Sequence, residues 1–132
     1  MKTKIILLFF VLALAGTTGC GGKNEDQNKG KATTKKSGAY PLADKGKEIF
    51  EGKGTCNNCH KLDVKLVGPS IQEIAKIYKM NKISIAKFLT GTEEPVIDPA
   101  QYEVMKINFE ITKNFTDEER LAVEEYIFSQ GK

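Results

Sequence analysis

The sequence CNNCH, at residues 56–60, holds two of the three cysteines of the chain and its one histidine. Two residues lie between the cysteines, and the histidine directly follows the second cysteine. A single short turn of chain therefore presents all three side chains. A lone histidine placed directly after a Cys-x-x-Cys pair indicates a joint role for Cys56, Cys59 and His60. The rest of the chain determines which role that is.

The first 19 residues indicate export. Lys2 and Lys4 precede an unbroken apolar run of 11 residues at positions 5–15. That run is shorter than the roughly 20 residues that a membrane-spanning helix needs. A basic start, a short apolar stretch and then small residues form the layout of a secretory signal. We therefore expect residues 1–19 to be a signal peptide of the lipoprotein type.

Cys20 is the expected site of lipid attachment. The sequence GTTGC at residues 16–20 resembles a bacterial lipobox, although Thr17 stands where Leu is usual. Cleavage after the sequence ALA at residues 13–15 would instead leave Cys20 as a free thiol, which is unusual in an exported protein. Several acyl chains on Cys20 would anchor the protein firmly to a membrane, with the rest facing the periplasm or the cell exterior.

Residues 20–39 are expected to form a lipid-anchored flexible tether. Residues 21–39 offer almost no side chains for a core and carry five lysines against two acidic residues, a composition typical of disorder. A ragged N-terminus without a role is the alternative. The folded domain is then residues 40–132, with 13 basic and 15 acidic residues. A nucleic-acid-binding domain would be markedly basic, so we expect no nucleic-acid partner.

Within the domain, the hydrophobic periodicity predicts about four short helices and no sheet. The expected N-terminal capping residues are, in chain order, Asp44, Ser70 and Thr116, and a further helix is expected to start near Ser84. Glu73 and Glu119 would close capping boxes at the second and fourth helices. Residues 92–115, which contain two prolines, are expected to be a long loop, and loops of that length usually have a function. The apolar content is thin, which indicates an all-α fold completed by an added group.

Three kinds of site use Cys-x-x-Cys-His in an exported protein. In covalent haem attachment each thiol adds to one vinyl group of the porphyrin and the imidazole binds the iron. A redox dithiol usually lies in a βαβ unit, whereas the flanks here are helical. Zinc needs four ligands, and the domain offers three conventional soft ones. A disulfide beside an incidental histidine is the remaining alternative. Export and helical flanks favour one covalent haem c on Cys56 and Cys59, with His60 as an iron ligand.

The other face of the iron has no second histidine to bind it. A methionine thioether favours ferrous iron and raises the potential, and Met80 and Met105 are available. Met80 ends the second predicted helix, where ordinary packing or exposure would explain it. Met105 lies in the long loop, 45 residues after His60, and is the expected ligand. Alternating apolar residues at positions 105, 107, 109 and 111 also fit a half-buried strand, and a lysine or an empty sixth position stays open.

The sequence resembles the bacterial class I cytochromes c over nearly the whole domain. CNNCH is followed by KLVGPSIQEIAKIY at residues 65–78, which is similar to the Gly-Pro segment and helix of that family. FTDEERLAVEEYIFSQ at residues 115–130 looks like the family's C-terminal helix, which packs across the first helix. The resemblance implies a small His/Met cytochrome c fold with a long distal loop. It also implies that the Pro69 carbonyl accepts a hydrogen bond from the other nitrogen of His60. Many relatives follow the methionine with prolines, whereas this chain reads MKINFEITKN at residues 105–114.

With protein ligands on both faces of the iron, the remaining task is to move one electron. We expect a carrier and not an enzyme, tethered to the membrane, whose haem cycles Fe(III)/Fe(II) between redox proteins of the membrane or periplasm. A haem-based ligand sensor or small peroxidase with an open distal site is the alternative, as is a haemless binding lipoprotein. Five lysines could ring the haem edge and steer acidic partners, or could simply be solvated: Lys53, Lys61, Lys65, Lys106 and Lys113.

Overall fold

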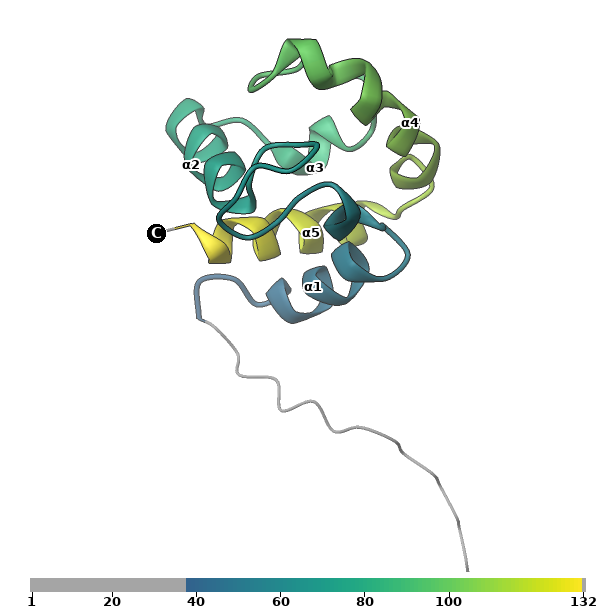
Figure 1. Cartoon of the computed structure of the whole chain (residues 1–132). Helices are drawn as coiled ribbons and strands as arrows, with labels where there is room; N and C mark the ends of the chain where they lie inside the picture. The colour runs from purple at the N-terminus through teal and green to yellow at the C-terminus, as the bar shows by residue number, and fades with distance from the viewer. Residues whose placement is uncertain (1–37, 132) are drawn as a thin grey trace, which may run out of the picture. The chain divides into compact units, whose positions relative to one another are not determined.

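The computed structural model describes residues 38–131, which form helices and loops with one isolated bridge between His60 and Lys65. Within this range the α-helices are α1 (Ala43–Glu51), α2 (Ile71–Asn81), α3 (Ile85–Phe88), α4 (Tyr102–Thr112) and α5 (Asp117–Gln130). The expected all-α class is confirmed, with one helix more than expected (Figure 1). Residues 1–37, including Cys20 and almost all of the expected tether, lie outside the described residues. In the described part no helix is long and apolar enough to cross a membrane.

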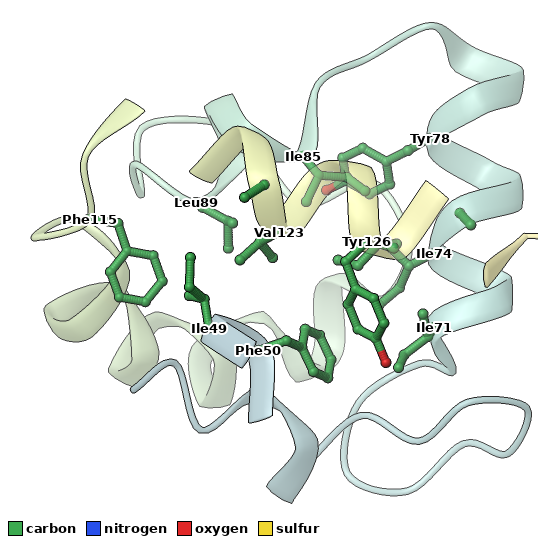
Figure 2. Packing of buried hydrophobic residues seen from close by; sticks show 13 residues of the cluster. Ile49, Phe50, Ile71, Ile74, Tyr78, Ile85, Leu89, Phe115, Val123 and Tyr126 are labelled. Carbon is green, nitrogen blue, oxygen red and sulfur yellow. The ribbon is translucent and has the colours of Figure 1, made fainter. Parts of the chain in front are cut away.

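Helix α5 is the central element, with α1 on one side of it and α2 and α3 on the other (Figure 1). The crossing of α1 and α5 is close because α1 presents Gly46 to the backbone of α5. A Cβ atom at residue 46 would lie 1.9 Å from the carbonyl oxygen of Ala122 and 2.8 Å from Cβ of Tyr126. Beside this point the rings of Phe50 and Tyr126 meet edge to face, with centroids 5.3 Å apart (Figure 2). The two helices therefore lock through one small residue and one aromatic pair.

Buried aliphatic and aromatic side chains of α1, α2, α3 and α5 form the hydrophobic core (Figure 2). Val123 of α5 is almost completely buried at its centre. Cys56 and Met105 are partly buried and pack against this core. One thiol of the CNNCH turn and the side chain of the expected methionine thus contact the same hydrophobic core.

Helices α2 and α5 begin at the expected capping residues, and α3 begins after Ser84, where its start was expected. The hydroxyl oxygen of Ser70 accepts from the Glu73 amide, and that of Ser84 accepts from the Lys87 amide. At α5 both halves of the capping box are present between Thr116 and Glu119. Such side chains satisfy amides that the first helical turn leaves without a partner.

The predicted Asp44 cap of α1 is wrong, since α1 already begins at Ala43 and its N-cap residue, Leu42, makes no side-chain cap. The Leu42 amide instead donates to Glu125 Oε2 of α5, at 2.6 Å. Glu124 acts in the same way on α3, where its Oε2 accepts from the Ala86 amide at 2.8 Å. Carboxylates of α5 therefore hold the first turns of two neighbouring helices, where a negative charge is favourable.

The prediction of a long loop at residues 92–115 is wrong for much of its length. Helix α4 occupies Tyr102–Thr112, and a 3-10 turn, Pro99–Gln101, precedes it. The alternative of a half-buried strand is also wrong. The inward face of α4 repeats at helical spacing through Met105, Phe109 and Thr112, and Thr112 is fully buried. Its hydroxyl group donates to the Leu89 carbonyl at 2.7 Å. A buried threonine and an exposed Ile107 mask the period that an amphipathic helix normally displays.

Candidate functional site

A cavity with an empty volume of about 880 Å³, part of it open to solvent, hollows the described domain. Cofactor pockets are lined mainly by hydrophobic side chains with a few polar groups. Most of the residues around this cavity are apolar, among them Phe50 of α1, Ile74 of α2 and Val123 of α5. The lining therefore suits a mainly apolar ligand, in agreement with a core that needs an added group.

The CNNCH turn lies at this cavity, and Cys56, Cys59 and His60 all line it. Residues Cys56–Asn58 form a 3-10 turn, in which the Cys59 and His60 amides both donate to the Cys56 carbonyl, at 3.1 and 3.0 Å. Thr55 enters the turn with a left-handed φ of 51°. The turn thus brings two thiols and an imidazole to one ligand site, and both thiols are free.

The environment of Cys56 does not suit a redox dithiol. Burial raises the pKa of the Cys56 thiol to about 11, and its Sγ lies 3.3 Å from the Gly54 carbonyl oxygen, to which the thiol donates. A reactive cysteine needs a lowered pKa and a positively charged setting. The structure also does not support zinc, because residues 38–131 contain no cluster of three or more His, Cys, Asp or Glu side chains placed to hold a metal ion.

His60 is oriented by the carbonyl group of Pro69, which lies 2.7 Å from its Nδ1 atom. A carbonyl oxygen can only accept, so Nδ1 carries the proton and Nε2 keeps its lone pair. Burial lowers the pKa of His60, against the opposing effect of the hydrogen bond to Pro69. The neutral imidazole is the form that binds a metal, and a fixed second nitrogen sets its orientation.

Gly68 packs against the ring of His60, a role that sequence reasoning did not assign to it. A Cβ atom at residue 68 would lie 2.4 Å from Cε1 and 2.8 Å from Nδ1 of His60. The Gly68 amide donates to the Cys59 carbonyl at 3.1 Å, which ties this glycine to the turn. The ring centroid of Phe50 is 6.5 Å from that of His60. The imidazole is therefore enclosed by a glycine, an aromatic ring and the Pro69 carbonyl.

Met105 of α4 lines the same cavity as Cys56, Cys59 and His60. Met80 does not line it and is 71% exposed. The amide nitrogen of Asn108, one helical turn after Met105, lies 4.0 Å from the Met105 sulfur. The structure therefore brings the expected methionine together with the CNNCH side chains and leaves the other methionine outside.

Polar contacts fix both ends of α4. Near its start Tyr102 donates its hydroxyl hydrogen to the Glu93 carbonyl at 3.1 Å. At its end Arg120 of α5 donates to the Thr112 and Phe115 carbonyls. These contacts span only five to nine positions, but each joins a side chain to a backbone carbonyl group, which hydrophobic periodicity does not indicate. They determine where α4 presents Met105 and Asn108.

This donor set fits a covalently attached haem. Two free thiols, an imidazole with a free Nε2 and a thioether surround one apolar cavity. A protein-family model described as cytochrome c matches residues 43–130, from the start of α1 to the end of α5. A search of the curated proteins found no match.

Proposed function

The chain belongs to the cytochrome c family and is therefore an electron-transfer protein with covalently bound haem c, and we propose that its iron is held between His60 and Met105. The observation that carries the proposal is the shared cavity, which Cys56, Cys59, His60 and Met105 all line. Cys56 and Cys59 would hold one haem through two thioethers. Nε2 of His60 and Sδ of Met105 would be the two protein ligands. When bound, haem takes up and releases one electron at its iron.

The side chains around this site prepare the two ligands. The Pro69 carbonyl holds the proton on Nδ1 of His60, which leaves Nε2 for the metal. Gly68 leaves room for the imidazole ring in that orientation. The mainly apolar wall offers few polar groups that could reorient when the charge in the site changes. Ligands from the protein on both faces would leave no open position for a substrate, which favours an electron carrier over an enzyme.

The carrier is proposed to be exported and tethered to a membrane. Residues 1–19 would be the signal peptide, Cys20 the lipidated residue and residues 20–39 the tether to a domain at 40–132. A tether restricts the domain to the membrane surface and raises its effective concentration near membrane-bound partners. The partners would be respiratory-type redox proteins of the membrane or periplasm. Replacing Cys20 by Ser should move the protein from the membrane fraction to the soluble fraction with its absorption spectrum intact. Retention in the membrane would contradict lipid anchoring.

The haem proposal is tested on protein made in cells that attach c-type haem. We expect colour that stays with the polypeptide in acidified acetone and one haem per chain by pyridine haemochrome. When both Cys56 and Cys59 are replaced by Ser, acidified acetone should extract any bound haem from the polypeptide. Colourless wild-type protein, or haem that is extracted from it, would contradict the proposal.

A further inference from the structure

The C-terminal end of α4 is closed by a side chain of the next helix. The last four carbonyl groups of an α-helix have no partner within it, and many helices satisfy them with a glycine in the left-handed region. Helix α4 instead runs into Lys113, whose φ is −62°. Two amides of the following turn donate to the Ile111 and Thr112 carbonyls, each at 3.1 Å. Further donors come from Arg120 of α5.

The guanidinium group of Arg120 reaches three carbonyl groups at this end of α4. Its Nη1 atom lies 3.3 Å from the Thr112 oxygen and 3.4 Å from the Lys113 oxygen, and it also donates to the Phe115 carbonyl. Its Nη2 atom donates to Oδ1 of Asp117 at 2.5 Å, which fixes the orientation of the group. The side chain of Arg120 is only 12% exposed. A largely enclosed positive charge therefore lies at the negative end of the α4 dipole, where it stabilises the helix.

The sequence sets this position apart from every other basic residue. Arg120 is the one arginine of the chain, among 20 basic residues. A guanidinium offers five donors in a rigid plane, whereas an ammonium is a point charge on a flexible stem, so a site with several carbonyl groups favours arginine. Within its own helix the residue is badly placed, because a cation is unfavourable near the N-terminus of a helix. A residue that breaks a rule of its own helix usually serves another part of the structure.

Lys53 holds the same corner between α4 and α5 from the other side of Phe115. Its Nζ atom lies 4.7 Å from the ring centroid of Phe115 and 2.6 Å from Oε1 of Glu119. Phe115 is buried in the hydrophobic core, and Lys53 precedes Cys56 by three residues. The corner is therefore tied to the segment that leads into CNNCH, and the end of α4 is fixed relative to that segment.

Met105 and Thr112 lie seven residues apart on the inward face of α4, where Met105 lines the cavity and Thr112 is fully buried. Seven residues are two helical turns, about 10 Å along the axis, so a movement of the anchored end displaces Met105. We propose that Arg120 is the positioning residue for Met105. By holding the end of α4 it keeps the thioether where it can bind the iron, and without it α4 tilts and opens the distal face. The inference rests on the proposed function, because it needs an iron held between His60 and Met105.

Two substitutions in the haem-loaded full chain test this role. Arg120→Gln removes the charge and the planar set of donors. Lys113→Gln is the matched control, because it removes a cation from the same end of α4 and leaves the Lys113 carbonyl in place. The Lys113 side chain makes an exposed ion pair with Glu110, and such pairs contribute little to stability. The two variants therefore change the net charge equally but differ in their contacts with the end of α4.

The methionine ligand of Arg120→Gln should be lost before the fold is. On heating, the far-red methionine band of the oxidised protein should disappear at a lower temperature than in the wild type, while helix unfolding measured by circular dichroism moves less. The reduced form should bind carbon monoxide about tenfold faster than the wild type, which is the order expected when a charge-assisted hydrogen bond is lost. Lys113→Gln should behave as the wild type in both measurements.

A double-mutant cycle shows whether Arg120 acts through Met105. A thioether ligand raises the reduction potential, so Arg120→Gln should lower the potential of the wild type toward that of Met105→Ala. In the Met105→Ala background the same substitution should change the potential no more than Lys113→Gln does. A purely structural or electrostatic role of Arg120 would instead shift the potential equally in both backgrounds.

The outcomes separate this inference from the proposed function. A wild type without the far-red band would contradict the proposed ligands, and the inference would fall with them. A wild type that has the band, together with equal midpoints and carbon monoxide rates for Arg120→Gln and Lys113→Gln, would overturn the role of Arg120 alone. Equal shifts of the potential in the two backgrounds would overturn it as well. Should Arg120→Gln not accumulate, Arg120→Lys, which keeps the charge but not the planar set of donors, replaces it in both comparisons under the same criteria.

Discussion

The carbonyl oxygen of Pro69 lies 2.7 Å from Nδ1 of His60, and the residue before that proline is the glycine that packs against the same imidazole. One dipeptide therefore both positions the ring and fixes its tautomer. The orientation of a metal-binding histidine depends on such partners as much as on the histidine itself.

Gly68→Ala should disturb the iron ligand directly. The added methyl group would lie 2.4 Å from Cε1 of His60, so the ring must turn and lengthen its hydrogen bond to Pro69. We expect a shifted reduction potential and a loss of stability of about 1–3 kcal/mol, as in other overpacked sites. Voltammetry and denaturant unfolding measure both effects. Gly38→Ala is the control, because a Cβ atom there meets nothing within 4 Å. Equal potentials for the two variants would contradict the role of Gly68.

Gly46→Ala should be the more damaging substitution for the fold. Its methyl group would lie 1.9 Å from the Ala122 carbonyl oxygen, which is backbone and cannot move without separating α1 from α5. The expected loss is at least about 3 kcal/mol, the upper part of the range for overpacking, and is measured from the denaturant midpoint of the haem-loaded protein. Lys45→Ala, which removes only an exposed ion pair with Glu118, should cost under about 1 kcal/mol. If Gly46→Ala were as mild as Lys45→Ala, the close crossing would not be essential.

Thr112→Val tests how α4 is held. The substitution keeps the shape of a fully buried side chain but removes its hydrogen bond to the Leu89 carbonyl. Leaving that carbonyl without its partner should cost about 1–3 kcal/mol. The far-red methionine band of the oxidised protein should also weaken on heating at a lower temperature than in the wild type. Thr92→Val, at an exposed position, should change stability by no more than about 0.5 kcal/mol. Identical behaviour of the two variants would show that Thr112 does not anchor α4.

Tyr78 gives the protein a predictable sensitivity to alkali. Burial raises the pKa of its hydroxyl group from the ordinary value of 10.0 to about 12. The stabilising effect is fully present below the pKa of the unfolded chain. Above about pH 10 the unfolded tyrosine loses its proton first, so stability falls as the pH rises toward the native pKa near 12. Unfolding midpoints measured across this range should fall more steeply in the wild type than in Tyr78→Phe. Parallel curves would contradict the assignment.

Local sequence patterns predicted much of the helical framework. Ser70, Ser84 and Thr116 cap helices through residues only three positions away, so the relevant contact is visible in the sequence itself. The all-α class followed from the same patterns, together with the resemblance carried by CNNCH and the C-terminal helix.

The parts that were missed depend on contacts between distant residues. Helix α4 was hidden because its inner face includes Asn108 and the buried Thr112, whose partner lies 23 positions away. The Glu125 contact with the Leu42 amide spans 83 positions. Gly68 stood in the quoted motif, but only the folded loop brings it against His60. Hydrophobic periodicity and helix propensity carry no information on these contacts between distant residues.

The central claim, that His60 and Met105 hold the iron from its two faces, is tested most directly by spectroscopy of the haem-loaded protein. The oxidised wild type should show the weak far-red band of sulfur-to-iron ligation, and its reduced form should not bind carbon monoxide readily. Met105→Ala should lose the band and bind carbon monoxide, while Met80→Ala should behave as the wild type. A band that survives in Met105→Ala, or a wild-type reduced protein that binds carbon monoxide at once, would contradict the account and favour an open distal site suited to a sensor or peroxidase.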